Sequence, residues 1–302
     1  MESRRLEIVC EGLKQARKII QEIEKLREST CIAFYQIGTE INAFTAYKFN
    51  KLLRRMEKRK LLDLIIESGG GDLDAAAKIS KLLKKYFDKY TAIVPFYAKS
   101  AATYLALRAD TLILCKAGEL GPIDPQVKHP TADIWIPAHS IKEAIEFIEE
   151  TKDPLVKLSM ADKLDPLLMG AYRDVEKATQ QYVQEVFEGL EEEKKNIALH
   201  SFTGRYRSHG YPIDDNVCKS VGIKLECIDE NLEKKIYDLH EEYLEIFREL
   251  KLKGLSIIQS SQMFDVEVNG KDITRTLEEK FPELTSKQGK EKRERKVEKK
   301  DK

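Results

Sequence analysis

The sequence predicts an α/β protein with a mostly parallel β-sheet, flanking helices and a helical C-terminal appendage. Short apolar segments alternate with helical patterns, which is typical of a parallel sheet with right-handed crossovers. Residues 61–67 (LLDLIIE) stop at a run of glycines before helical spacing resumes over 73–87. Residues 91–97 (TAIVPFY) stop at a second turn before a short helix over 101–108. These two strand–turn–helix units carry the prediction of the fold class.

The other elements follow in order along the chain. Residues 6–28 place apolar side chains three and four apart among charges, so we expect an amphipathic helix. Residues 31–37 (CIAFYQI) are β-branched and aromatic, which predicts a buried strand. Beyond these we expect a helix at 44–60, a strand at 111–115, an irregular Gly/Pro-rich loop at 118–130, helices over 155–200 and 212–221, a last strand at 224–228, a charged helix at 231–253 and a hairpin that turns at Asn269-Gly270.

This order divides the chain into four parts. Residues 1–29 form an N-terminal helix, 30–229 the main domain, 230–285 an appendage of helix and hairpin, and 286–302 a disordered basic tail. The stretch 287–302 holds nine Lys/Arg against four Asp/Glu, a local net charge of +5, and no aromatic residue. We interpret it as a solubilising tail; contact with nucleic acid or an acidic partner is the alternative.

The composition excludes several classes of protein. Lys and Arg number 52 and so do Asp and Glu, so no net charge draws the chain toward nucleic acid or an anionic membrane. No apolar run approaches the roughly 18 residues of a spanning helix, and no signal peptide opens the chain, so we expect a cytoplasmic protein without a membrane span. The five cysteines are widely spaced without a C-x-x-C pair, which indicates reduced, mostly buried thiols and no metal site.

Two turns at the carboxyl ends of neighbouring strands are the candidates for chemistry. In Ser68-Gly69-Gly70-Gly71, glycines let the backbone approach a ligand with its N–H groups turned outward, which suits an oxyanion or a phosphate. The phosphate alternative is weakened because no Gly-Lys-Ser/Thr frame is present and acidic Asp72 follows directly. Asp72 instead suits the N-cap of the next helix.

The second turn contains Ser100 at a strand-to-helix junction between small residues, in the sequence AKSAA. An A-x-S-x-A segment can replace G-x-S-x-G in a nucleophile elbow, where small neighbours let the backbone fold tightly and expose the hydroxyl. The alternative is that Ser100 is an ordinary helix N-cap. Spacing alone does not decide between them.

Four segments resemble the serine dehydrogenase proteinase family, a cytoplasmic branch of the Clp protease and crotonase fold related to signal peptide peptidase A. The segments are ESGGGD, FDKYTAIVPFYAKSAATYLALRADTLIL, GELGPIDPQV and SHGYPIDDNVCKSVGI, within about residues 30–222. The sequence departs from such proteases at Gly69, where they usually have proline in a Ser-Pro-Gly-Gly turn. The resemblance implies that 30–229 is a serine proteinase domain of that fold.

The resemblance also implies the roles of the two turns. Ser100 is the nucleophile, and the N–H groups of Gly70 or Gly71 and of Ala101 form the oxyanion hole. Fixed backbone donors stabilise the developing oxyanion by about 3 to 4 kcal/mol each. A serine hydroxyl also needs an adjacent base, because it is almost wholly protonated at neutral pH.

The general base is left open between a lysine and a histidine. Clp proteases have a histidine about 25 residues after the serine, but here that neighbourhood reads Pro122-Ile123-Asp124-Pro125-Gln126. Relatives with a Ser-Lys dyad carry a lysine roughly forty to fifty residues after the serine, where Lys142 and Lys152 lie. We favour Lys142, which ends the segment IPAHSIK; as a base it has to be buried to lose its proton near neutral pH.

His209, in the SHGYPI segment, is the second candidate, because the matching segment of Clp proteases lies close to their acidic triad member. Asp124 either orients the base or caps its Pro-bounded turn. His139 and His200 lie in no motif, and Lys99 is expected to point away from the Ser100 hydroxyl.

We therefore expect a cytoplasmic serine hydrolase that cleaves peptide bonds through an acyl-enzyme, without a cofactor or metal. Its partners are expected to be a peptide or protein substrate and further copies of the chain. One alternative is an acyl-thioester (CoA) enzyme of the same fold, which the acidic residues Asp72, Asp74 and Asp124 disfavour. Another is a catalytically silent scaffold whose long helices recruit partners.

Overall fold

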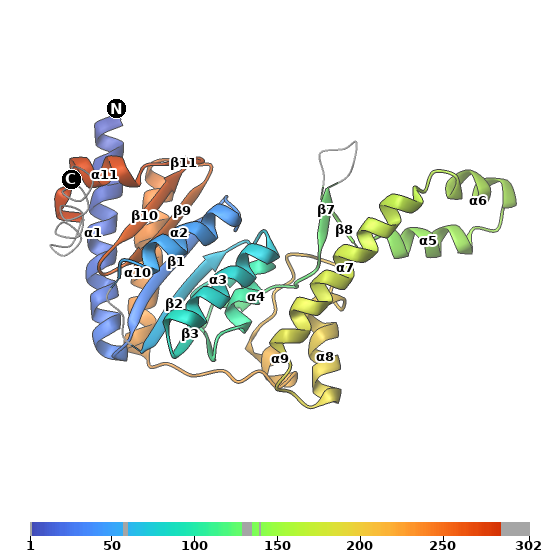
Figure 1. Cartoon of the computed structure of the whole chain (residues 1–302), viewed down its shortest axis with the longest axis horizontal. Helices are drawn as coiled ribbons and strands as arrows, with labels where there is room; N and C mark the ends of the chain where they lie inside the picture. The colour runs from blue at the N-terminus through green and yellow to red at the C-terminus, as the bar shows by residue number, and fades with distance from the viewer. Residues whose placement is uncertain (1, 57–59, 129–134, 139, 285–302) are drawn as a thin grey trace, which may run out of the picture. The chain divides into compact units, whose positions relative to one another are not determined.

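The protein consists of two compact units in the computed structural model, which describes residues 2–56, 60–128, 135–138 and 140–284 (Figure 1). The first, here called the sheet unit, contains residues 1–120, 214–219 and 223–302. The second, here called the helical unit, contains residues 121–213 and 220–222. The predicted tail at 286–302 lies outside the described residues.

The sheet unit is built on parallel strands joined by helices. Strands β1 (Thr30–Ile37), β2 (Leu61–Ser68), β3 (Lys89–Val94) and β5 (Thr111–Leu114) pair in parallel in this order. The crossovers contain α2 (Ala43–Leu53), α3 (Leu73–Tyr86) and α4 (Ala101–Leu107). Two short strands, β4 (Tyr97–Ala98) and β6 (Glu119–Leu120), extend the parallel pairing from the end of β2. The predicted mostly parallel α/β sheet with flanking helices is confirmed.

The C-terminal hairpin is part of this sheet, which differs from the predicted appendage at 230–285. Strand β9 (Leu255–Ser260) pairs antiparallel with β1, and β10 (Phe264–Val268) pairs with β9, followed by β11 (Lys271–Asp272). All six residues of β9 are buried, because β9 lies between β1 and β10 inside the sheet. The hairpin also covers what would otherwise be an open edge of β1. The turn at Asn269-Gly270 forms as predicted, with both residues at positive φ.

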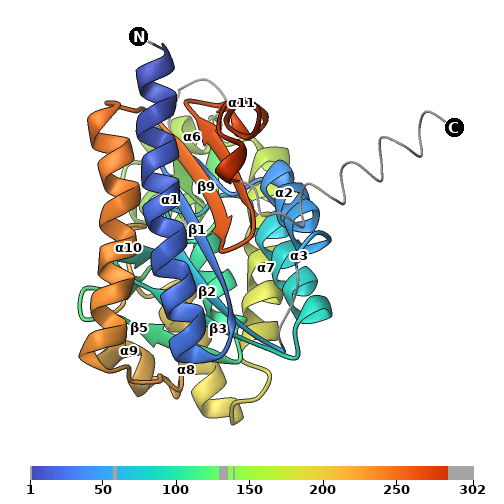
Figure 2. The same cartoon turned by 90° about the vertical axis from the view of Figure 1, so that its left-hand side faces the viewer.

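Helices cover both faces of the sheet. Helices α1 (Glu2–Arg27) and α10 (Glu230–Glu249) pack together on one face, while α2 and α3 lie on the other (Figure 2). Helix α4 packs against α3. The predicted N-terminal helix thus belongs to the core, since its apolar stripe is buried against α10 and the sheet. Helix α11 (Thr274–Lys280) and a 3₁₀ turn at Pro282–Leu284 end the described part of this unit.

The helical unit begins with a small hairpin. Its first strand, β7 (Gln126–Lys128), lies inside the segment predicted as an irregular loop, 118–130, and pairs with β8 (Trp135–Pro137) beyond it. Helices α5 (Ser140–Glu150), α6 (Pro154–Ala161), α7 (Pro166–Val186) and α8 (Glu192–Thr203) follow. Asp153 and Asp165 cap α6 and α7, each with proline in the first helical turn. Helix α9 (Asp215–Ser220), most of which belongs to the sheet unit, ends before Gly222. In the sheet unit, the strand predicted at 224–228 is only one bridge, between Leu225 and Leu112.

Three further predictions concern the whole chain. Among the residues that the structure describes, no helix has both the length and the apolar character that a membrane span requires. All five cysteines are free thiols, and four of them are buried, as expected; Cys227 is exposed. Within the same residues, no group of three or more His, Cys, Asp or Glu side chains is arranged to hold a metal ion.

Candidate active site

Ser100 stands at the junction of β4 and α4 with a backbone conformation rare for a residue with a side chain. Its φ is 51° and its ψ is −121°, and such a conformation costs about 1 to 3 kcal/mol. Its side chain makes no capping hydrogen bond to the helix, so the interpretation of Ser100 as an ordinary N-cap does not hold. The buried small residues Ala101 and Ala102 leave room for the sharp turn. This is the geometry of a strand–turn–helix elbow that presents a hydroxyl.

Gly70 packs directly against this elbow. A Cβ atom on Gly70 would lie 2.5 Å from the carbonyl oxygen of Lys99 and 2.7 Å from Cβ of Ser100. Gly70 also has a φ of +100°, which side chains rarely adopt. The glycine turn after β2 and the serine turn after β4 therefore touch, as the pairing of Ser68 with Ala98 requires.

The three backbone amides predicted for the oxyanion hole are not equivalent. The Gly70 amide donates a hydrogen bond to the buried Ser68 Oγ at 3.1 Å, and Ser68 in turn donates to Gln36. Within the described part of the chain, the amides of Gly71 and Ala101 have no hydrogen-bond partner. Of the two alternatives, Gly70 or Gly71, the geometry thus favours Gly71 together with Ala101.

Ile41, just before α2, fixes the glycine turn from its other side. The Ile41 amide donates to the Gly70 carbonyl oxygen at 2.8 Å, and the Asp72 amide donates to the Ile41 carbonyl oxygen at 2.8 Å. A Cβ atom on Gly71, whose φ is +140°, would lie 2.4 Å from that Ile41 oxygen. The main chain of Ile41 thus occupies the space that a side chain at position 71 would need.

Two charged residues beside these turns behave as predicted. Asp72 caps α3 by accepting hydrogen bonds from the amides of Asp74 and Ala75. Lys99 directs its Nζ to the carbonyl oxygen of Leu120 at 3.0 Å and to Glu119 at 2.6 Å, so its ammonium group is held by β6. The Asp72 carboxylate would repel a phosphate, and the Lys99 ammonium group is already bound to Glu119, so neither residue supports a phosphate site.

The helical unit joins two of the predicted site residues. Nδ1 of His209 lies 2.6 Å from Oδ1 of Asp124, and Nε2 of Gln126 donates to the other oxygen, Oδ2, at 3.1 Å. The Asp124 side chain is buried, with 4% of its surface exposed, while that of His209 is 34% exposed. An Nδ1–H that donates to the carboxylate leaves Nε2 as the hydrogen-bond acceptor of the ring. The pair is therefore equipped to accept a proton at Nε2.

The two lysine candidates lie on exposed helix surface or next to it. Lys142 on α5 has 80% of its side chain exposed and lies 3.9 Å from Glu146, one turn further on. Lys152, after the same helix, is also exposed. Burial, the condition that a lysine base requires, is not met for either residue within the helical unit. His200 is exposed at the end of α8, and His139 lies outside the described residues.

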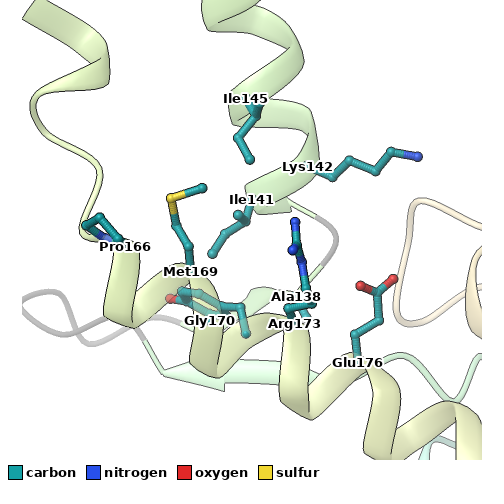
Figure 3. A pocket seen from close by; sticks show the side chains of 10 residues that line it. Ala138, Ile141, Lys142, Ile145, Pro166, Met169, Gly170, Arg173 and Glu176 are labelled. Carbon is teal, nitrogen blue, oxygen red and sulfur yellow. The ribbon is translucent and has the colours of Figure 1, made fainter.

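A cavity of about 350 Å³ lies between α5 and α7 in the helical unit (Figure 3). Its wall is mostly apolar, with Ile141, Ile145 and Met169, and Gly170 faces it without a side chain. Lys142 stands at its rim and extends away from Met169 (Figure 3). Asp124 and His209 do not line this cavity, so it is separate from the pair described above.

The roles of three residues at the site were not predicted from the sequence. Ser68 and Ile41 shape the glycine turn, and Gln126 holds the second oxygen of Asp124. Ile41 contributes only its main chain, so no side-chain pattern marks it. Gln126 stands within GPIDPQ, one of the segments that carry the family resemblance, and this is a signal that could have found it.

Comparisons with known proteins place these residues in a family context. The family described as ClpP-like SDH-type serine proteinase matches residues 7–251. The uncharacterized protein MJ0137 of Methanocaldococcus jannaschii is 32% identical over 260 residues, which cover 80% of this chain and 84% of that protein. MJ1495 of the same organism is 29% identical over 238 residues, 75% of each chain.

Two solved structures are similar at lower identity. A serine-to-alanine mutant of the 1510-N membrane-bound stomatin-specific protease is 16% identical, with a TM-score of 0.41 over 65% of this chain and 79% of that one. ClpP1 from Listeria monocytogenes is 15% identical, with a TM-score of 0.42 over 69% of this chain and 98% of that one.

Proposed function

Because this chain belongs to the ClpP-like SDH-type serine proteinase family, we propose that it cleaves peptide bonds through an acyl-enzyme formed on Ser100. The observation that carries this proposal is the elbow itself. Ser100 has strained backbone angles after β4, and its hydroxyl makes no hydrogen bond that caps α4. The glycine turn packs against the Ser100 turn. Strain of this kind persists only where the surroundings impose it, and it is concentrated at functional sites.

The oxyanion is proposed to bind the amides of Gly71 and Ala101. Attack of Ser100 Oγ on the substrate carbonyl carbon moves negative charge onto the carbonyl oxygen. These two N–H groups have no other hydrogen-bond partner among the described residues, so both can donate to that oxygen. Each is worth about 3 to 4 kcal/mol in the transition state. The Gly70 amide is already engaged by Ser68, so its role is to let the two turns approach each other.

The general base is proposed to be His209, oriented by Asp124. With Nδ1–H donated to the carboxylate, Nε2 takes the proton of the Ser100 hydroxyl as the acyl bond forms. The same nitrogen then returns the proton to the departing amine. Water, activated in the same way, hydrolyses the acyl-enzyme and regenerates Ser100.

This assignment exchanges the positions that Clp proteases use for histidine and acid. Their histidine follows the serine by about 25 residues, where this chain has Asp124, and His209 lies in the segment that matches their acidic region. A hydrogen-bonded His–Asp pair keeps the same chemistry whichever position supplies each member. Lys142 is the alternative base, and its exposure and its Glu146 neighbour disfavour it.

A fluorophosphonate probe tests the proposal. We expect the purified protein to be labelled once, on Ser100, and Ser100→Ala to remain unlabelled with an unchanged circular dichroism spectrum. An acyl-thioester enzyme or a silent scaffold of the same fold would give no label on Ser100 in either protein. We further propose that the enzyme acts in the cytoplasm, which its free thiols support.

A further inference from the structure

Glu67 is a buried acid that the proposed chemistry does not use. It is 2% exposed and directly precedes Ser68 at the end of β2. Its Oε2 accepts a hydrogen bond from the Tyr97 amide at 3.2 Å, and the amides of Tyr97 and Phe96 both lower the pKa of its carboxyl group. Both amides belong to the segment that leads into Ser100, so this carboxyl group contacts the main chain just before the Ser100 turn.

Two further polar groups share the burial of Glu67. Tyr35 lies beside it in the β1–β2 register, and Nδ1 of His240, on α10, is 3.8 Å from its Oε2, too far for a hydrogen bond. The Tyr35 hydroxyl and His240 Nδ1 are both buried and have no hydrogen-bond partner in the described part of the chain. Their rings are 5.8 Å apart, so the three groups form one buried polar cluster.

The groups around this cluster favour its neutral form. Burial raises the pKa of Glu67 to about 8, against the lowering effect of the Tyr97 and Phe96 amides, and Glu119 on β6 adds to the increase. Burial also lowers the pKa of His240, with Glu241 opposing and Arg248 assisting. The pKa of Tyr35 is raised by burial and by Glu67. Near neutral pH all three groups are therefore uncharged.

The end of β2 contacts the nucleophile segment residue by residue. Glu67 binds the amide of Tyr97, the Ser68 carbonyl oxygen accepts from the Lys99 amide at 3.0 Å, and Gly70 touches Ser100. Glu67 is the first of these contacts and the only one of them made by an ionisable side chain. A change in its charge acts on the segment that carries the nucleophile.

We propose that protonated Glu67, buried with Tyr35 and His240, is a positioning residue that holds residues 96–97 and so sets the orientation of Ser100. The inference rests on the proposed role of Ser100 as nucleophile. When Glu67 loses its proton, a negative charge is left among Tyr35, His240 and Glu119 on three different elements. The cluster must open to solvate that charge, and the segment before the elbow loosens.

The test compares Glu67→Gln and Glu67→Leu with the unaltered chain. Glutamine keeps an oxygen for the Tyr97 amide and cannot ionise, whereas leucine removes the acceptor. Asp63→Asn is the matched control, because it alters a buried acid at the other end of β2 that binds Arg27 and Ser29. Hydrogen exchange of peptides that cover residues 96–101 is measured for all four proteins, together with the rate of fluorophosphonate labelling from about pH 6 to 9.5.

We expect Glu67→Leu to expose residues 96–101 to exchange and to slow labelling about 10-fold or more. Glu67→Gln should keep both within about twofold at neutral pH and remove a fall in labelling that the unaltered chain shows above about pH 8. Equal exchange at 96–101 in all four proteins, or the same alkaline fall in Glu67→Gln, would overturn the inference. If the unaltered chain is not labelled at all, the proposed function fails, and exchange at 96–101 still decides the role of Glu67.

Discussion

Nδ1 of His209 lies 2.6 Å from Oδ1 of Asp124, although the two residues are 85 positions apart in the chain. The buried carboxylate fixes the ring orientation and stabilises the imidazolium that forms when the ring accepts a proton. An exposed lysine has no comparable support, and this difference is the basis of the first prediction.

Replacing His209 by alanine should lower the rate of Ser100 acylation by about 10² to 10⁴-fold, because a general base contributes that much. Asp124→Asn should lower it too, since an amide no longer stabilises the imidazolium. Labelling and peptide hydrolysis measure both effects. Lys142→Arg serves as the control and should retain activity. A dead Lys142→Arg beside an active His209→Ala would assign the base to Lys142 instead.

Gly70→Ala should inactivate the enzyme and destabilise it by about 1 to 3 kcal/mol, because its Cβ would meet Lys99 and Ser100 at a φ of +100°. Gly69→Ala is the matched control one residue earlier. A Cβ atom there has no neighbour within 4 Å, so activity should be unchanged. Denaturant unfolding and labelling rates check both variants. Full turnover in Gly70→Ala would show that the glycine turn does not serve the reaction.

Ser100→Gly should be inactive and more stable than the unaltered chain by about 1 kcal/mol, since glycine adopts a positive φ without strain. Ser100→Ala should also be inactive but keep nearly the same melting temperature, because alanine retains the strain. Thermal unfolding distinguishes the two variants. A destabilised Ser100→Gly would mean that the serine side chain supports the fold.

The stability of the protein should fall as pH rises from about 5 to 8. In the folded chain Glu67 holds its proton up to about pH 8, whereas the ordinary pKa of a glutamate, which applies to the unfolded chain, is 4.5. Between these pH values the unfolded chain releases the proton and the folded chain does not, so the free energy of unfolding falls by up to about 1.4 kcal/mol per pH unit. Above pH 8 this contribution levels off. Denaturant unfolding at several pH values measures it as a difference from Glu67→Gln, which lacks the slope; parallel curves for the two proteins would refute the assignment.

The protein should also self-associate, as the sequence predicts. Several large apolar side chains of α5, α6 and α7 are exposed, among them Phe147 at 62%, Leu158 at 69% and Leu167 at 85%. Light scattering at micromolar concentration should report an assembly larger than one chain, and Leu158→Glu with Leu167→Glu should shift it toward the monomer. A monomer in the unaltered protein would contradict this expectation.

The sequence predicts the parallel part of the sheet well, because strand and helix periodicities alternate clearly between residues 31 and 115. It does not reveal that β9 adds to β1, since antiparallel pairing across more than 200 residues leaves no local pattern. The 224–228 segment has strand-like composition, but only Leu225 finds a bridging partner.

For the site, the turns with Ser100 and Gly70 are recognisable because their residue types and small neighbours are local features. The choice between Lys142 and His209 is not, because it depends on burial and on a contact with Asp124 that joins distant segments. Likewise, the engagement of the Gly70 amide by Ser68 depends on a side-chain orientation that sequence does not encode locally.

The hydrogen bonds between Ile41 and the glycine turn bear on how this chain replaces the proline found at position 69 in similar proteases. Proline restricts the turn before folding, by reducing the freedom of the unfolded chain. Three consecutive glycines do the opposite, and ordering them opposes folding by roughly 0.5 to 1 kcal/mol each relative to alanine. Here the main chain of Ile41 pairs with both sides of Gly71. Two hydrogen bonds to one residue just before α2 thus supply the conformational restraint that a proline would give at position 69.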